Sequence, residues 1–154
     1  ESDALPAVLF TPTTKAEAGH DLPMSFQQVV GMVGEAAARA LSDRAIAIYR
    51  FAHDYARQRG VIIADTKFEF GDINGELSVI DEMLTPDSSR FWDAKLYAPG
   101  ASQPSYDKQI VRDWLIAAGW NKEPPAPALP DDVVRRTSER YQEVFRILTG
   151  QALK

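Results

Sequence analysis

The chain has 154 residues and is 45% hydrophobic, which is enough for one domain with a core of its own. Its formal net charge of −5 argues against a general binder of nucleic acid or of acidic membranes. Cysteine is absent, so disulfides and thiolate metal sites are excluded, and a cytoplasmic location is expected. The sequence has no apolar run of about 18 residues that could span a membrane, and it shows no signal peptide.

The first 24 residues are interrupted by prolines and show no sustained periodicity. This pattern predicts an irregular lead-in with a short strand at Ala7–Phe10. Polar groups gather within it at residues 13–21, and a solvated loop is one interpretation because loops are polar for turn chemistry alone. The other interpretation is that Lys15 and the Gly-His-Asp turn that ends at Asp21 present donors to an anionic ligand.

Two helices are expected next. Ser25, with Gln28 three residues later, has the pattern of a capping box. Gly31 and Gly34 are expected to divide a short first helix from a long second helix, Glu35–Arg59. The second helix carries apolar residues at intervals of three and four, which is typical of packing against a sheet or another helix.

The stretch around which the rest of the chain is organised is Val61–Trp92. It begins with two runs that alternate apolar and charged residues, separated by the turn Asp72–Gly75, and this is the pattern of a β-hairpin. It ends in a loop, Thr85–Arg90, that is rich in groups able to bind anions or a metal. Three charged residues of the first run fall on one face of the strand, namely Asp65, Lys67 and Glu69.

The register of this hairpin decides whether Glu69 and Asp81 lie on the same charged face. The preferred register has a three-residue loop, Ile73–Gly75, with Lys67 opposite Asp81. Glu69 is then a diagonal neighbour of Asp81, within reach of a shared ion. A two-residue Asn74-Gly75 turn is the competitor, and it sends Asp81 to the other face from Glu69.

The C-terminal third is predicted to be helical. After a turn-rich connection at 99–105, a helix is expected over Asp107–Ala118. Lys108 and Arg112 lie four residues apart in it, so they share a face and are placed to converge on one anion. A last helix is predicted over Asp131–Thr149. Its apolar stripe is expected to consist of Val134, Tyr141, Val144, Phe145 and Leu148.

Two carboxylates and a lysine on one hairpin face fit a magnesium–phosphate site, because Mg²⁺ typically takes one or two carboxylates together with phosphate oxygens. Arg90 and Arg112 are suited to bind a second anionic group with their forked donors. The alternative is a charged sheet face that is only solvated, since many antiparallel sheets have one face in water. The residues by themselves thus indicate an α+β domain with a candidate phosphate–metal face.

Four blocks of the chain form an ordered set of motifs. The two central blocks read IADTKFEFG at 63–71 and DEMLTPDSSRFW at 81–92. A later block reads SYDKQ at 105–109 with RDWL at 112–115, and an earlier one reads FTPTTKAE at 10–17 with GHD at 19–21. Together they closely resemble the SAICAR synthetase (phosphoribosylaminoimidazole-succinocarboxamide synthase) family of purine biosynthesis. The resemblance covers nearly the whole chain.

The resemblance implies an antiparallel β-hairpin or sheet packed against several α-helices, as in the C-terminal domain of that kinase-like or ATP-grasp-like fold. It implies a ligase that joins L-aspartate to carboxyaminoimidazole ribotide to give SAICAR, with ATP cleaved to ADP and phosphate. Mg²⁺ would accompany the ATP. The expected partners are these small molecules, with no nucleic acid and no membrane, and the assembly is expected to be a monomer or a homo-oligomer.

The same resemblance assigns roles to residues. Lys67 and Asp81 are implied to be catalytic, Glu69 and Asp81 to hold the metal, and all three to bind the nucleotide phosphates. The expected substrate-binding residues are Lys15, Asp21, Ser89, Arg90, Lys108 and Arg112. Leu22 and Pro23 replace polar residues that often follow the His-Asp pair, which leaves the shape of that loop open.

Members of the family are longer, and their N-terminal half carries the lid over the phosphates and most of the adenine pocket. Because the chain begins at Glu1 without an initiator methionine, residues 1–154 are expected to be a single C-terminal ATP- and substrate-binding domain, without that half and inactive by itself. Two other functions stay open. The chain could be a non-catalytic domain of the same fold that binds a nucleotide or phosphometabolite, or an interaction domain.

Overall fold

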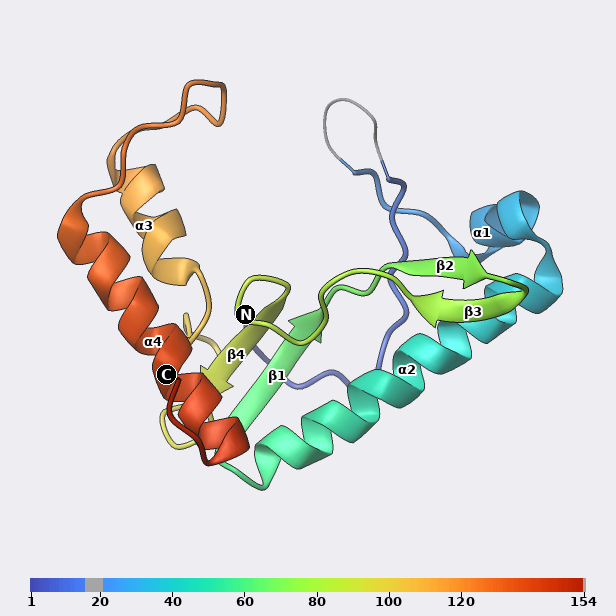
Figure 1. Ribbon diagram of the computed structural model, residues 1–154, viewed down its shortest axis with the longest axis horizontal. Coiled ribbons are helices and arrows are strands. Elements are labelled where there is room, and N and C mark those ends of the chain that lie inside the picture. The colour runs from blue at the N-terminus through green and yellow to red at the C-terminus, as the bar shows by residue number, and fades with distance from the viewer. Residues whose placement is uncertain (16–20, 154) are drawn as a thin grey trace. The chain divides into compact units, whose positions relative to one another are not determined.

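The computed structural model describes residues 1–15 and 21–153 and shows an α+β fold, as expected (Figure 1). The helices of this part of the chain are α1 (Phe26–Val33), α2 (Glu35–Arg57), α3 (Gln109–Ala117) and α4 (Asp131–Thr149). The strands are β1 (Val61–Thr66), β2 (Phe70–Ile73), β3 (Glu76–Val79) and β4 (Ser89–Asp93). In the described part of the chain, no helix combines the length and the apolar character needed to cross a membrane.

The chain divides into two compact units. The β1–β4 unit consists of Glu1–Asp3, Ala52–Lys67 and Glu82–Lys154. The β2–β3 unit consists of Ala4–Phe51 and Phe68–Asp81. Each unit therefore has its own two-stranded antiparallel sheet, and neither sheet pairs with the other in the described residues.

The sheet of the β1–β4 unit forms the centre of its core. Val61 and Ile63 on β1 and Phe91 on β4 are almost fully buried. The two strands are antiparallel, with Ile63 opposite Phe91. The hairpin about the turn at 72–75 is present as β2 and β3, but the pairing of β1 with β4 was not predicted.

A third segment joins the edge of β4. Ser105 forms a bridge with Trp92, and the amide of Tyr106 donates to the carbonyl of Phe91 at 2.8 Å. The Tyr106 hydroxyl donates to Asp93 Oδ2 at 3.0 Å. The chain that leads into α3 is thus fixed to β4 by both backbone and side-chain bonds.

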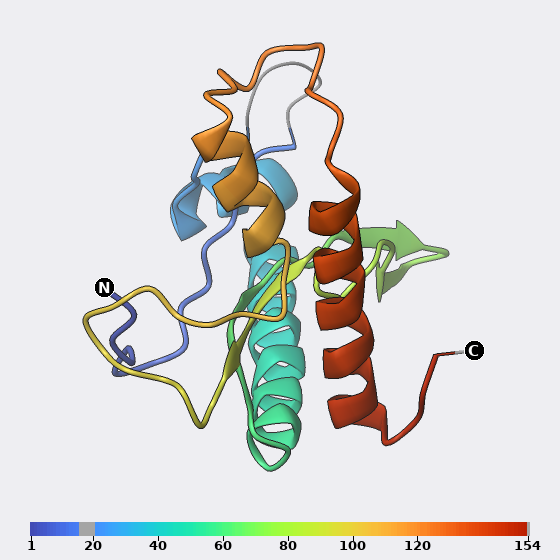
Figure 2. The same ribbon diagram turned by 90° about the vertical axis from the view of Figure 1, so that its left-hand side faces the viewer.

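The helices α3 and α4 lie side by side within the same unit (Figure 2). The bounds of α4 are those expected, and Gly150 ends the helix in the left-handed conformation with φ 73°. The expected apolar stripe is wrong at one position, because Val134 is 50% exposed whereas its neighbour Val133 is 3% exposed. Val144 is fully buried, as expected.

The sheet of the β2–β3 unit shows which hairpin register is right. Ile73 pairs with Glu76, so the loop is the two-residue turn Asn74-Gly75 and the preferred three-residue loop is wrong. Both turn residues have positive φ, 56° for Asn74 and 85° for Gly75, as a type I′ turn requires. The amide of Gly75 also donates to Asp72 Oδ1 at 2.8 Å, which stabilises this tight turn.

The N-terminal part of the β2–β3 unit is irregular, as expected, but Ala7–Phe10 forms no strand. Thr13 instead bridges Pro23. The helix α1 begins with the expected capping box, in which the Ser25 side chain accepts from the Gln28 amide. The Gly-His part of the expected Gly-His-Asp turn lies outside the described residues.

Two valines of α4 test where the core lies. Val144→Ala should lower the free energy of unfolding by about 2 to 3 kcal/mol, because it removes buried methyl groups and leaves a cavity. Val134→Ala is the matched control on the same helix and should change the free energy of unfolding by about 0.5 kcal/mol or less. Urea unfolding of the two variants measures this, and equal losses would contradict the assigned burial.

Candidate functional site

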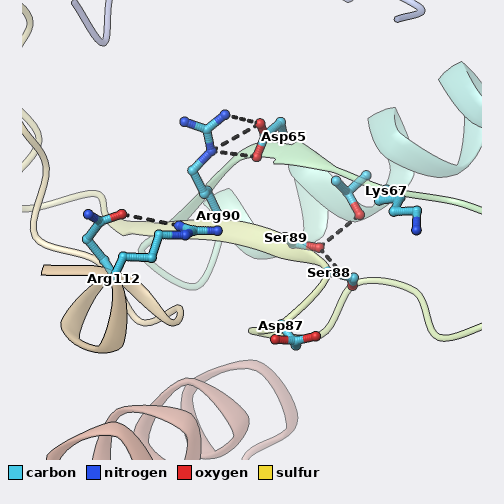
Figure 3. Close-up of a pocket in the computed structure, with 9 residues that line it drawn as sticks. Asp65, Lys67, Asp87, Ser88, Ser89, Arg90 and Arg112 are labelled. Carbon is cyan, nitrogen blue, oxygen red and sulfur yellow. Dashed lines mark hydrogen bonds and ion pairs between the residues drawn. The ribbon is translucent and has the colours of Figure 1, made fainter. Parts of the chain in front are cut away.

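A polar cavity of about 460 Å³ lies in the β1–β4 unit, at the C-terminal end of β1 and the N-terminal end of β4 (Figure 3). Four of the residues expected from the sequence line it together, namely Lys67, Ser89, Arg90 and Arg112. The other lining residues are Asp65, Thr66, Asp87, Ser88 and Gln109. Of these five, Asp87 and Ser88 belong to the loop expected to bind anions or a metal, and Asp65, Thr66 and Gln109 were given no binding role.

The strand register is what brings these residues to one place. Thr66 pairs with Ser89, and Asp65 pairs with Arg90, so the last residues of β1 lie beside the first residues of β4. A shift of register between Ile63 and Asp65 interrupts the regular pairing just before the cavity. Beyond β1, the amide of Lys67 donates to the carbonyl of Ser88 at 3.0 Å, which extends the contact to the cavity mouth.

Arg90 is held by Asp65 in a forked ion pair. Its Nε donates to Asp65 Oδ1 at 2.9 Å and to Oδ2 at 3.0 Å, and its Nη2 also contacts Oδ2 (Figure 3). The hydrogen bond that Arg90 donates to Asp65 raises the pKa of Arg90, so the guanidinium stays charged. Both side chains are about half exposed, at 52% and 51%, so the pair contributes little to stability and mainly orients the guanidinium.

Asp65 was missed as a site residue, although a signal was present. It lies two residues before Lys67, on the face of the strand that sequence analysis identified as charged. Asp87, from the loop expected to bind anions or a metal, also lines the cavity.

The turn before β4 is fixed by its own side chains. The Thr85 amide donates to Ser88 Oγ at 3.0 Å, and the Ser88 amide donates to Thr85 Oγ1 at 3.1 Å. Ser89 is buried, and its hydroxyl donates to Thr66 Oγ1 at 2.8 Å. Two reciprocal bonds and one cross-strand bond therefore hold this wall of the cavity in a single shape.

The first turns of α3 supply the remaining cations. Lys108 is not a lining residue, but its Nζ donates to Asp87 Oδ1 at 2.8 Å and thereby contacts the cavity wall. Arg112 Nη1 donates to Gln109 Oε1 at 3.2 Å and lies 3.6 Å from Asp107 Oδ1. Helical spacing thus brings Lys108 and Arg112 to the same region, as expected.

The other expected site residues belong to the β2–β3 unit and do not line this cavity. Lys15 forms an ion pair with Glu69, and the side chain of Glu69 is 16% exposed. The carbonyl of Glu69 accepts a hydrogen bond from the amide of Ile80 at 3.0 Å. Asp21 and Asp81 are exposed residues of this unit.

The observed register changes the argument for a magnesium site. Lys67 bonds to Ser88 through its backbone, so it is not the partner of Asp81 that sequence analysis expected. Glu69 pairs through its backbone with Ile80, the residue before Asp81, so the register that would place Glu69 and Asp81 on one face is wrong. Because β3 ends at Val79, strand alternation no longer determines the direction of the Asp81 side chain.

Carboxylates such as those of Glu69 and Asp81 are ligands that Mg²⁺ takes when phosphate oxygens complete its shell. In the described ranges, 1–15 and 21–153, no three acidic or histidine side chains gather into a metal-binding group.

This geometry defines the class of protein as an α+β domain with a polar cavity that is lined in part by cationic side chains. The chain belongs to the SAICAR synthetase family, whose profile matches residues 1–127. It is similar to the phosphoribosylaminoimidazole-succinocarboxamide synthase of Thermodesulfovibrio yellowstonii, with 54% identity over 97% of this chain and 51% of the relative. The synthase of Methylococcus capsulatus is 56% identical over 97% of this chain and 51% of the relative.

Solved structures agree with this assignment. The SAICAR synthase from Saccharomyces cerevisiae complexed with SAICAR matches with a TM-score of 0.78 and 44% identity, over 87% of this chain and 45% of that one. A SAICAR synthetase in complex with ADP matches with a TM-score of 0.71 and 26% identity, over 97% of this chain and 54% of that one. The chain spans about half the length of the curated relatives that it matches.

The ion pair between Lys108 and Asp87 gives a pH-dependent prediction. The hydrogen bond from Lys108 lowers the pKa of Asp87 below its ordinary value of 3.8. Because the folded pKa is below the unfolded one, the pair stabilises the fold above about pH 3.8, and this contribution is lost as pH falls through the lowered pKa. In Lys108→Gln the pKa of Asp87, followed by carboxyl NMR, should rise toward its ordinary value.

Arg135→Gln is the control for this titration, since Arg135 pairs with Glu139 on α4. It removes a charge of the same sign and should leave the titration of Asp87 unchanged. A pKa of Asp87 that does not move in Lys108→Gln would mean that the two side chains are not paired in solution.

Proposed function

We propose that this chain is the C-terminal portion of an ATP-dependent ligase that joins L-aspartate to carboxyaminoimidazole ribotide, giving SAICAR, ADP and phosphate. The observation that carries the proposal is the identity of over half to curated synthases along almost the whole chain. The cation-lined cavity supports it, because the ribotide is an anion that needs forked donors. The alternative of a non-catalytic binding domain is not favoured by these relatives.

The cavity of the β1–β4 unit is the proposed ribotide site. Arg90 and Arg112 present planar guanidinium groups that match a phosphate or carboxylate with two donors each. Ser89 and Lys67 lie on the same wall, and Lys108 supports it through Asp87. Asp65 keeps Arg90 oriented before the ligand arrives, which lowers the cost of ordering on binding.

The carboxylates of the β2–β3 unit are proposed to face the nucleotide. Glu69 and Asp81 would hold the Mg²⁺ that accompanies ATP, and this ion would neutralise part of the phosphate charge. Lys15, which is paired with Glu69, and Asp21 are proposed to lie near the bound substrates. Lys67 is proposed to balance charge between the nucleotide phosphates and the substrate carboxylate.

The chemistry follows from the groups that react. A carboxylate is a poor electrophile. Transfer of the γ-phosphoryl group from ATP to an oxygen of the ribotide carboxylate breaks the bond to ADP, which leaves, and gives an acyl phosphate. The amine of aspartate then attacks the acyl carbon, phosphate leaves, and an amide bond forms. Cations around these anions lower the barrier because they stabilise charge where it develops. This reaction is proposed to take place in the cytoplasm.

The proposed metal ligand Asp81 can be tested by removing its charge. Asp81→Asn in the full-length protein should fold normally and lose about a hundredfold or more of its ATP- and aspartate-dependent product formation, since removal of one electrostatic stabiliser typically has this effect. Asp43→Asn changes an exposed aspartate of α2 and should keep the original rate. Turnover of Asp81→Asn near the original rate would show that the assignment is wrong.

The proposed ribotide site makes a different prediction. Arg90→Ala and Arg112→Ala should each raise the KM for the ribotide by about 10- to 100-fold, as expected for loss of a hydrogen bond to a charged group. The KM for ATP should change much less. Steady-state kinetics with each substrate varied in turn measures both, with Arg135→Ala on α4 as a control. Equal rises in the two KM values would contradict the assigned roles.

A further inference from the structure

Asp107 is a buried carboxylate next to the cavity, at the start of α3, and sequence analysis gave it no role. Its residue exposure is 1%, and it lines no part of the cavity surface. One oxygen, Oδ1, accepts the amide of Gln109 at 2.8 Å. The other, Oδ2, is buried without a hydrogen-bond partner in the part of the chain that the structure describes.

A carboxylate in this position needs a compensating cation. Burial raises the pKa of Asp107, and the Gln109 amide, the charge of Arg112 and the side chain of Ser105 act against that rise. Arg112 Nη1 lies 3.6 Å from Oδ1, too far for a hydrogen bond but close enough for an ion pair. The positive charge of Arg90 acts in the same direction, so both arginines of the cavity interact with this one buried charge.

Asp107 is also held firmly in place. Tyr106, directly before it, bonds to Phe91 through its backbone and to Asp93 through its hydroxyl, at 2.8 Å and 3.0 Å. Both partners lie on β4, the strand that carries Arg90. The carboxylate is therefore fixed relative to one arginine by strand bonding and relative to the other by the first turn of α3.

Arg112 has little else to orient it. Its side chain is 42% exposed, and its hydrogen bond to a side chain goes to the neutral amide oxygen of Gln109 at 3.2 Å. A long exposed side chain with one neutral partner can adopt many rotamers. The buried carboxylate of Asp107, 3.6 Å from Nη1, forms an ion pair with this side chain, and the charge of Asp87 on the cavity wall also acts on it.

We propose that Asp107 is a positioning residue, whose buried carboxylate holds the Arg112 guanidinium at the cavity wall so that it and Arg90 face one anionic group of the ribotide. The inference rests on the proposed function, because it names what sets the geometry of that same site. Asp107 does not touch the ligand. It acts through Arg112, in the way that residues which orient the ligand-contacting groups act in other binding sites.

The first test is Asp107→Asn in the full-length protein, which keeps the shape and the acceptor for the Gln109 amide but removes the charge. The KM for the ribotide should rise about tenfold, in the range seen for outer partners of binding groups, with little change in the KM for ATP. In an Arg112→Ala background the same substitution should have almost no further effect on ribotide KM. Additive effects, or equal rises in both KM values, would overturn the proposal.

Asp93→Asn is the matched control. Asp93 is a half-buried aspartate of β4 whose oxygens accept from the Tyr106 hydroxyl and the Lys95 amide, not from an arginine. Asp93→Asn should lower the melting temperature and leave the KM for the ribotide nearly unchanged. A loss of ribotide affinity in Asp93→Asn equal to that in Asp107→Asn would show that general loosening of the unit is the cause.

A second measurement does not depend on how well Asp107→Asn folds or on turnover. In Arg112→Gln the pKa of Asp107, read from carboxyl NMR, should rise above its value in the unaltered protein, because the compensating charge is gone. An unchanged pKa would overturn the proposal. Absence of amide formation by the unaltered full-length protein would instead reject the proposed function, while the coupling of Asp107 to Arg112 would still be measured.

Discussion

The pairing of β1 with β4 is the constraint on which the cavity depends. It joins residues that are more than twenty positions apart in the chain, and it places Asp65 and Thr66 opposite Arg90 and Ser89. The same strand, β4, receives the bonds of the segment that leads into α3. Because three walls of the cavity are fixed to two buried strands, its charged groups lie on a scaffold held by the core, and little ordering is needed when an anion binds.

Much of the local structure could be predicted from the sequence, because it is set by local signals. The capping box at Ser25 and Gln28, the bounds of α4 and its Gly150 cap each depend on a few neighbouring residues. The strand pairing could not, since β1 and β4 are separated by a complete hairpin and no local pattern records that choice. The prediction of the hairpin loop is wrong for another reason. It rests on a clustering of charges, whereas the backbone follows the strong turn signal of Asn74-Gly75.

The site was predictable to the extent that its residues carry charge in recognisable motifs. Arg90, Arg112, Lys67 and Ser89 were found in this way, and they meet in one cavity. Asp65 and Asp107 were not assigned roles, because they pair with the arginines of the cavity and are not themselves groups expected to contact an anion. A buried acid such as Asp107 looks like any other helix-start residue until the positions of its neighbours are known. The sequence therefore indicates the groups that contact a ligand more readily than the groups that orient them.

The bonds between β4 and the segment at 104–106 have a further consequence for the behaviour of the protein in concentrated solution. An open strand edge presents unpaired amides and carbonyls that can add a strand from another molecule. In β4 that edge is occupied, since Asp93 donates to Pro104 and Phe91 accepts from Tyr106. The short segment thus protects the sheet against edge-to-edge aggregation at the strand that carries the most buried aromatic ring of the unit, Phe91.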